Sequence, residues 1–268
     1  MNLEVLLSCM HQSDASIASQ VNLQSDAVIV NQCDIDNTVD VSFNNSAGNP
    51  CKIKFISTKE RGLSKSRNVA IRNSRADLCL IADDDECLDT DYPQTIIEAF
   101  QKYPQADIIA FDFTVGGKRQ KKYSNKVKKI GYLSALRISS IQIVFRRQRI
   151  EEKGIFFDEE MGAGTGHGAG EENKFLYDCL HNGLKVFFVP KHIVSLQERT
   201  TSTWFTGYNE TFYLQKGWET ERYMGKFFAT LFALYTTITK RSLYKENCSS
   251  LCVLKAMLRG IYSRNVFK

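Results

Sequence analysis

The sequence predicts an α/β fold in which helices flank a doubly wound, mostly parallel sheet. Two observations carry this prediction. Short apolar runs rich in β-branched residues are bounded by polar residues, as is typical of buried parallel strands. Segments with helical periodicity alternate with these runs over the first hundred residues. In such a sheet, ligands bind in a crevice at the carboxyl ends of the strands.

The predicted elements follow in chain order. The strands span residues 3–9, 26–32, 51–57, 76–82 and 106–115. A helix is expected over residues 62–74, where apolar residues fall at helical spacing and Ser64 is the candidate N-cap. A second helix is expected over residues 91–104, because one proline lies near its first turn and another closes it.

The composition favours a cytoplasmic protein with either one large α/β domain or one domain with an appended piece. Of the 268 residues 43% are hydrophobic, and the net charge of +5 favours anionic ligands or membrane surfaces without demanding nucleic acid. The eight cysteines include no C-x-x-C pair and no zinc-like spacing, so we expect them to be reduced. Residues 1–10 show no secretory signal, and the longest apolar stretch, residues 227–239, is too short to span a bilayer.

A run of acidic residues stands at the end of a predicted strand, in the sequence CLIADDDECLD (79–89). Adjacent carboxylates repel one another, so the run needs either a nearby cation or full solvation. Asp83 and Asp85 suit Mg²⁺ or Mn²⁺, which take oxygen ligands from one or two carboxylates and from substrate phosphates. The alternative is a capping cluster, in which Asp89 or Asp91 caps the next helix and the other acids are solvated.

Two separated blocks give this run its context. The sequence GLSKSRNVAIRNSRADLCLIADDDE (62–86) combines a Gly-x-Ser-x-x-Arg-Asn helix, a strand and a D-x-D. Residues 154–190 then bring a Phe-Asp-Glu, a glycine-rich loop, an acidic pair that opens a helix, and finally a Gly, a strand and a Pro. In this order the blocks resemble the inverting family 2 glycosyltransferases of GT-A fold, of the bacterial polysaccharide type. The resemblance covers roughly residues 1–205.

The resemblance implies a glycosyltransferase of the hexosyltransferase type. Its GT-A domain would occupy residues 1–215, with a nucleotide-binding half over about 1–115 and an acceptor-binding half over about 116–215. A basic amphipathic helical tail would follow over residues 216–268. The enzyme would transfer a sugar, with inversion, from a nucleotide-diphosphate sugar, UDP favoured, to a hydroxyl of a glycan or lipid-linked acceptor. Such a reaction belongs to polysaccharide biosynthesis.

On the nucleotide side, the resemblance gives roles to three residues. Ser8 ends the first strand, where the family's nucleotide pocket begins. Asn31 stands where the family usually has an Asp that contacts the base, and an amide can donate as well as accept. Arg67 is a candidate for contacting the base or the diphosphate, because a guanidinium presents a fixed fork of donors. The alternative for Arg67 is a side chain that extends from its helix into solvent.

The acidic run takes the next roles that the resemblance implies. Asp83 would bind ribose or sugar hydroxyls, and Asp84 would belong to the same nucleotide-sugar site. Asp85 would hold the metal, together with Asp83. The expected ion is Mn²⁺ or Mg²⁺, because a divalent cation offsets the charge that grows on a departing nucleotide diphosphate.

The glycine-rich loop GAGTGHGAG (162–170) is not a dinucleotide-binding motif, because it holds no G-x-G-x-x-G and no strand directly precedes it. It leads into Glu171 and Glu172. By resemblance, the second acid of this pair, Glu172, is the general base that takes the acceptor's proton, with Glu171 beside it in the catalytic site. The alternative is that both glutamates only stabilise a helix N-terminus.

Two basic regions raise the question of a membrane. Residues 118–129 hold seven basic residues, which are either a solvated run or an attraction for anionic lipid or a lipid-diphosphate acceptor. In the tail, residues 226–245 and 254–268 set aromatic and aliphatic residues beside Lys and Arg, as in helices that lie at a membrane interface. That pattern predicts peripheral attachment at the inner face of the membrane. Packing of these helices on the catalytic domain is the alternative.

Two other functions stay open from the residues alone. One is a nucleotide-sugar-binding protein without turnover, in which the acceptor base is lost. The other is a metal-dependent nucleotidyltransferase, a class that normally opens with a glycine-rich, basic phosphate loop near its first strand. Residues 8–16, SCMHQSDAS, contain no glycine, lysine or arginine, which counts against that class.

Overall fold

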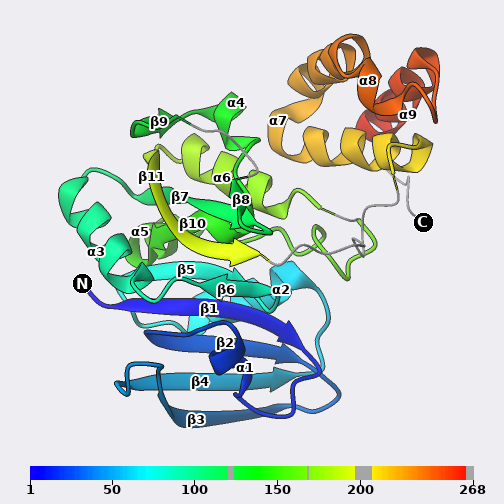
Figure 1. Ribbon diagram of the computed structural model, residues 1–268. Coiled ribbons are helices and arrows are strands. Elements are labelled where there is room, and N and C mark those ends of the chain that lie inside the picture. The colour runs from blue at the N-terminus through cyan, green and yellow to red at the C-terminus, as the bar shows by residue number, and fades with distance from the viewer. Residues whose placement is uncertain (120–123, 168, 197–206, 264–268) are drawn as a thin grey trace.

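A mixed β-sheet forms the centre of the molecule, with helices on both of its faces (Figure 1). The computed structural model describes residues 1–119, 124–167, 169–196 and 207–263. The strands in these ranges are β1 (Leu3–Met10), β2 (Asp26–Gln32), β3 (Asn37–Asn44), β4 (Pro50–Thr58), β5 (Leu78–Asp83), β6 (Glu86–Leu88), β7 (Ile108–Val115), β8 (Lys118–Arg119), β9 (Lys128–Ile130), β10 (Ile143–Arg146) and β11 (Val186–Leu196). Their order in the described part of the sheet is β3-β4-β2-β1-β5-β10-β7-β11-β6, with β8 paired to β7 and β9 to β11.

The helices pack around three hydrophobic cores, one on each face of the sheet and a third among the C-terminal helices. They are α1 (Ile17–Gln20), α2 (Leu63–Asn73), α3 (Tyr92–Lys102), α4 (Tyr132–Ala135), α5 (Arg147–Glu152), α6 (Glu171–His181), α7 (Glu210–Thr239), α8 (Arg241–Tyr244) and α9 (Ser250–Tyr262). Successive side chains of a strand point to opposite faces. On β1, Val5 and Leu7 therefore join the core that α3 covers, whereas Leu6 joins the core that α2 and α6 cover.

The strand directions bring several strand ends to one edge of the sheet. β4, β2, β1 and β5 are parallel, which confirms the predicted doubly wound sheet. β10 runs antiparallel between β5 and β7, so the sheet as a whole is mixed. The register pairs Ser8 of β1 with Asp83 of β5, and Cys9 of β1 with Asn31 of β2. The ends of three neighbouring strands thus meet where a ligand crevice is expected.

The predicted elements of the first 115 residues are all present, with ends within two residues of the expected ones. β3 was not expected, because it is an edge strand whose residues are mostly exposed and polar. The predicted N-cap of α2 is wrong. Gly62 is the N-cap, at φ 123°, and the hydroxyl of Ser64 is buried and donates to the Met161 carbonyl oxygen at 2.6 Å. All eight cysteines are free thiols, as expected.

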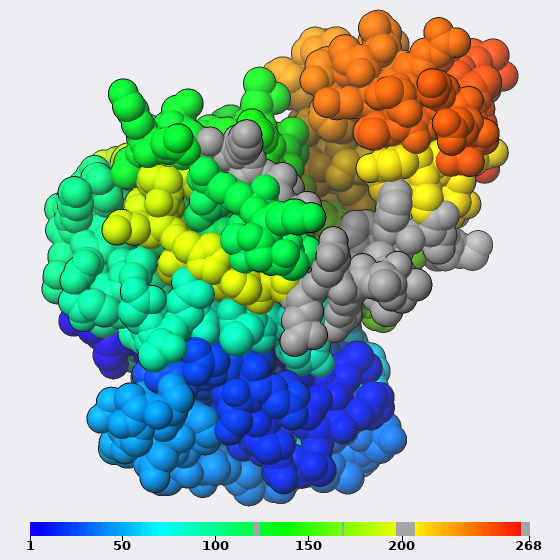
Figure 2. All heavy atoms as spheres, in the orientation of Figure 1, coloured from blue at the N-terminus to red at the C-terminus, as the bar shows by residue number. Residues whose placement is uncertain are grey.

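The C-terminal helices form a lobe beside the sheet (Figure 2). α7 is kinked at Gly225, which has a φ of 72°. α9 crosses α7 in backbone contact, since a Cβ on Gly217 would lie 2.1 Å from the Met257 carbonyl oxygen and one on Gly260 would lie 2.1 Å from that of Leu214. Only glycine allows such an approach. Tyr223 of α7 packs in the core beneath α6, so the helix belongs to both parts of the molecule.

The predicted domain boundary between residues 215 and 216 falls inside α7. Of the two basic stretches predicted from sequence, residues 120–123 and 264–268 lie outside the described residues, and so does residue 168 of the glycine-rich loop. Within the described ranges, no helix combines the length and apolar character that crossing a membrane requires.

Candidate active site

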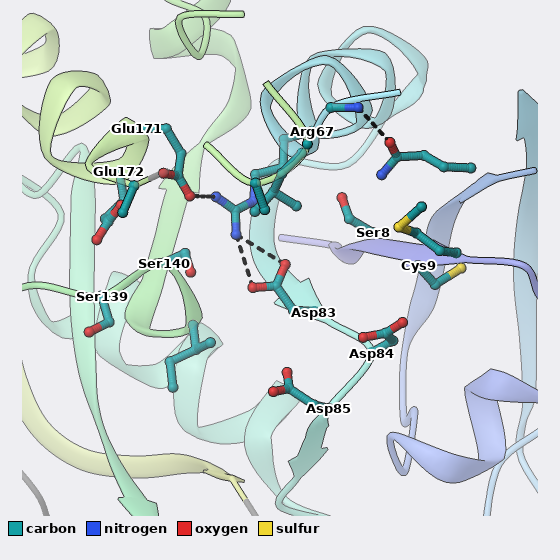
Figure 3. Close-up of a pocket in the computed structure, with 18 of the residues that line it drawn as sticks. Ser8, Cys9, Arg67, Asp83, Asp84, Asp85, Ser139, Ser140, Glu171 and Glu172 are labelled. Carbon is teal, nitrogen blue, oxygen red and sulfur yellow. Dashed lines mark hydrogen bonds and ion pairs between the residues drawn. The ribbon is translucent and has the colours of Figure 1, made fainter. Parts of the chain in front are cut away.

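A pocket of about 790 Å³ opens at the carboxyl ends of β1, β2 and β5 (Figure 3). Ser8, Gln32 and Asp83 contribute to it from these strands, and Asp84 and Asp85 follow from the turn after β5. Glu171 and Glu172 reach it from the first turn of α6. The pocket thus brings together the two sequence blocks that stand about 90 residues apart in the chain, and the charged residues that it gathers are mostly acidic.

Arg67 of α2 is the cation that lies beside the acidic run. Its side chain is 1% exposed, and it does not extend into solvent. Its Nη2 donates to both carboxylate oxygens of Asp83 at 3.0 Å, and its Nη1 donates to Glu171 Oε1 at 2.9 Å. Burial opposes the charge of Arg67, but Asp83 and Glu171 outweigh it and raise the pKa of the guanidinium. The sequence had assigned Arg67 to the base or diphosphate, and had not indicated that it joins two carboxylates.

The four adjacent acidic side chains, residues 83–86, lie in different environments. Asp83 forms a salt bridge with Arg67, Asp84 is exposed, and Asp85 is half-buried in the pocket wall. Glu86 lies behind them at 4% exposure, where its Oε1 accepts a hydrogen bond from the Asp83 backbone N–H at 2.9 Å. Burial and the charge of Asp83 raise the pKa of Glu86 well above its ordinary value. This raised pKa favours the neutral form of Glu86, and a neutral Glu86 would lessen the repulsion within the run.

The two glutamates at the start of α6 also lie in different environments. Gly170, in the left-handed conformation at φ 96°, is the N-cap of the helix, and both glutamates follow in its first turn. Glu171 pairs with Arg67, whereas Glu172 forms no salt bridge with any residue that the structure describes. Burial and the neighbouring charge of Glu171 raise the pKa of Glu172 to about 8. A carboxylate with such a pKa is a stronger base than an ordinary glutamate, and it titrates close to neutral pH.

The nucleotide-side residues predicted from sequence do not all reach the pocket. Ser8 lines it, and its Oγ accepts a hydrogen bond from the Ser66 hydroxyl at 2.9 Å. Asn31 is 1% exposed and is not part of the wall. Its amide binds the backbone of Gln12, accepting at 2.9 Å and donating at 2.8 Å, so the structure does not support a base contact by Asn31. The next residue, Gln32, lines the pocket instead.

Asp85, one of the two metal ligands predicted from sequence, lines the pocket. Both oxygens of Asp83, the other predicted ligand, are bound by Arg67. Within the described residues there is no group of three or more His, Cys, Asp or Glu side chains that could hold a metal by themselves. Mg²⁺ commonly binds through one or two carboxylates and completes its shell with substrate phosphates and water. The donor set therefore fits a cation that arrives with a diphosphate, and it does not fit a cage made by the protein alone.

A comparison with protein families covers the first sequence block and the beginning of the second. A family model described as glycosyl transferase family 2 matches residues 8–165, which is more than half of the chain. A comparison with curated protein sequences gave no match.

Among solved structures, S. aureus TarS 1-349 in complex with UDP-GlcNAc is similar to the chain, with a TM-score of 0.63 and 16% identity over 97% of this chain and 82% of that one. A second structure of S. aureus TarS 1-349 gives a TM-score of 0.61 and 14% identity over 98% and 81%. A further structure of S. aureus TarS gives 0.58 and 14% over 92% and 45%. At such identities the likeness concerns the fold.

Proposed function

The chain belongs to glycosyl transferase family 2, and from this membership we propose that it is an inverting, metal-dependent enzyme. It transfers a sugar from a UDP-sugar to a hydroxyl of a glycan or lipid-linked saccharide in polysaccharide biosynthesis. One observation carries the proposal. Arg67 forms salt bridges with Asp83 and Glu171, and this leaves Glu172 as the carboxylate of the pair that can take up a proton.

Transfer proceeds in one displacement. Glu172 accepts the proton of the acceptor hydroxyl, and the acceptor oxygen forms its bond to the anomeric carbon. The bond between that carbon and the diphosphate breaks, and its electron pair leaves with the nucleotide diphosphate. Because attack and departure occur on opposite faces of the sugar, the anomeric configuration inverts. No covalent intermediate with the protein is needed, so the free cysteines take no part.

The negative charge of the donor diphosphate would be offset by a divalent cation bound in the pocket. Asp85 would hold Mg²⁺ or Mn²⁺, and the bound ion would offset the negative charge of the diphosphate. Asp83 is fixed by Arg67 with a 25% exposed side chain, which suits a carboxylate that accepts from ribose or sugar hydroxyls. Asp84 is exposed at the same rim. The complex of TarS with UDP-GlcNAc supports UDP as the nucleotide.

An exposed apolar face on α7 supports a membrane-bound acceptor. Beyond the kink, Phe227, Leu231, Leu234 and Ile238 follow one another at helical spacing, and all are exposed. The described residues 226–263 carry six Lys or Arg and a single acid, Glu246. Apolar side chains rimmed by positive charge suit an anionic bilayer surface, where each basic residue contributes about 1 kcal/mol. We therefore place reversible, peripheral attachment of the enzyme at this face.

A donor screen tests the proposed reaction. UDP-glucose, UDP-galactose and UDP-GlcNAc are incubated with the full chain and Mn²⁺, and UDP release is measured with and without chelator. The proposal expects metal-dependent release from at least one donor. Analysis of a glycoside product by NMR should then show inverted anomeric configuration. Release that is unaffected by chelator, or a product of retained configuration, would contradict the proposed mechanism.

A further inference from the structure

The glycine-rich loop ends against a buried carboxylate of the C-terminal helix. Glu219 of α7 is 4% exposed, and its carboxylate accepts a hydrogen bond from the backbone N–H of Ala169. A Cβ on Gly170 would lie 3.2 Å from Glu219 Oε2, so the two groups are in tight contact. Gly170 is the N-cap of α6, directly before Glu171 and Glu172. Glu219 therefore contacts the turn that sets the direction of both glutamates.

Two further contacts join the same helix to the same loop. The Trp218 ring stacks on the His167 ring, with 4.4 Å between centroids and 21° between planes. Arg222 donates to Asp158 Oδ2 from Nε at 3.0 Å and from Nη2 at 2.6 Å. Three residues within two turns of α7 thus contact Asp158, His167 and Ala169. The first half of α7, most of which the sequence assigned to a tail, packs against the residues that precede α6.

Around the start of α6 there are more carboxylates than cations, and Glu172 is the carboxylate that lacks a cationic partner among the described residues. Asp83, Glu171, Glu172 and Glu219 are four carboxylates, whereas Arg67 and Lys216 are the two cations that pair within this group. Arg67 pairs with Glu171 at 2.9 Å, and Lys216 Nζ pairs with Glu219 Oε2 at 3.0 Å. Arg67 is shared between Glu171 and Asp83, and Lys216 is taken by Glu219, so Glu172 has no salt bridge among the described residues.

Glu172 faces charged or titratable groups from three helices. Glu171 belongs to its own helix, Arg67 to α2, and Lys216 and Tyr223 to α7. Burial and Glu171 act to raise the pKa of Glu172, and the two cations act to lower it. Lys216 itself is held in place by Glu219, so a change at either residue of α7 alters the field at Glu172.

We propose that Lys216 and Glu219 are positioning residues for the catalytic base. Glu219 fixes the turn at Ala169 and Gly170, and this turn directs Glu172 into the pocket. Lys216 anchors Glu219 and also supplies a positive charge near Glu172 from α7. The inference rests on the proposed role of Glu172, and it makes the first half of α7 a functional part of the glycosyltransferase domain.

The titration of the Glu172 carboxyl tests this inference without any donor. The full chain is labelled with ¹³C at the glutamate carboxyl carbons, and the signal of Glu172 is assigned by its loss in Glu172→Gln. The signal is then followed by NMR against pH. In Lys216→Met the pKa of Glu172 should rise by about 1 pH unit, because a nearby cation is lost. In Glu219→Gln it should fall, because a nearby anion is lost and Lys216 is released.

Opposite shifts in the pKa of Glu172 would indicate an electrostatic effect of the two residues. A general loosening of the fold would shift this pKa in the same direction in both variants. Lys153→Met, which removes an exposed lysine just after α5, should leave the titration unchanged. Thermal unfolding confirms that each variant is folded before it is titrated. If Lys216→Met and Glu219→Gln both titrate as the unmodified chain does, or both shift in one direction, the inference is overturned. The role of Glu172 as base is judged separately, by the turnover of Glu172→Gln.

Discussion

The guanidinium of Arg67 and the carboxylate of Glu171 meet across 104 residues of sequence, at 2.9 Å. Because the same guanidinium binds both carboxylate oxygens of Asp83, it joins the end of β5 to the first turn of α6. The β5 side and the α6 side of the pocket are therefore held together by one buried arginine. It fixes the distance between the acids on the two sides of the pocket.

Removing this link should destabilise the protein. In Arg67→Met two carboxylates lose their partner in a buried setting, so we expect the free energy of unfolding to fall by about 3–5 kcal/mol. Arg72→Met is the matched control on the same helix. Its guanidinium is half exposed and lies 3.9 Å from Glu159, so it should cost less than about 1 kcal/mol. Denaturant unfolding measures both, and equal losses would contradict the role given to Arg67.

Glu172 should make stability depend on pH. Its pKa in the folded state is about 8, above the ordinary value of 4.5, so between these values the folded chain holds a proton that the unfolded chain releases. Its contribution to stability therefore falls as pH rises from about 4.5 to about 8 and then levels off. Glu172→Gln cannot ionise. It should match the unmodified chain near pH 4.5 and be more stable at pH 8.5.

Denaturant unfolding at the two pH values checks this expectation, with Glu98→Gln as the control at an exposed position of α3. A difference between Glu172→Gln and the unmodified chain that does not grow with pH would show that the pKa of Glu172 is not raised.

Donor binding should require a divalent cation. The diphosphate is strongly negative, and the pocket's buried arginine is already paired with two carboxylates. Calorimetry with UDP should therefore give high affinity with Mn²⁺ and a large loss of affinity with chelator or in Asp85→Asn. Asp91→Asn, an exposed acid outside the pocket wall, is the control. Equal affinities for UDP with and without the metal would exclude the site at Asp85.

The apolar face of α7 should bind anionic vesicles. Truncation is a poor test, because it would remove Tyr223 from the core. In its place, Phe227, Leu231 and Ile238, which are exposed by 70%, 48% and 76%, are changed together to serine. Co-sedimentation of this variant should fall at low salt, whereas Leu133→Ser, at a position exposed by 80% elsewhere, should pellet as the unmodified chain does.

Binding of the unmodified chain should also weaken as salt rises, because the basic residues act through screened charge. Vesicle binding that survives the triple substitution would place the contact elsewhere.

Local patterns predicted the sheet better than they predicted the contacts within the site. β1, β2, β4 and β5 are largely buried, so apolar runs reveal them. The short antiparallel strand β10 and the exposed strand β3 carry weaker patterns, and their pairing depends on distant strands. The aspartates and the glutamate pair could be named because their motifs are local.

The partners of these acids could not be named in the same way. The pairing of Arg67 with Glu171, and of Lys216 with Glu219, follows from how α2, α6 and α7 pack. Lys216 and Glu219 also lie outside residues 8–165, which is the part of the chain that the family model matches. No sequence motif marked these two residues. The surroundings of Asn31 could not be predicted for a related reason. Its position at a strand end was visible in the sequence, but its bonds to Gln12 were not.

Turnover of the two glutamine variants of the acidic pair tests the assignment of the base most directly. UDP release from the best donor, in the presence of acceptor and Mn²⁺, is compared among the unmodified chain, Glu172→Gln and Glu171→Gln, with UDP affinity measured alongside. Glu172→Gln should keep its affinity for UDP and lose about two to four orders of magnitude in kcat. Glu171→Gln should lose stability through its contact with Arg67 and retain more of its kcat. A loss of turnover in Glu171→Gln, with Glu172→Gln still active, would contradict the assignment of Glu172 as the base.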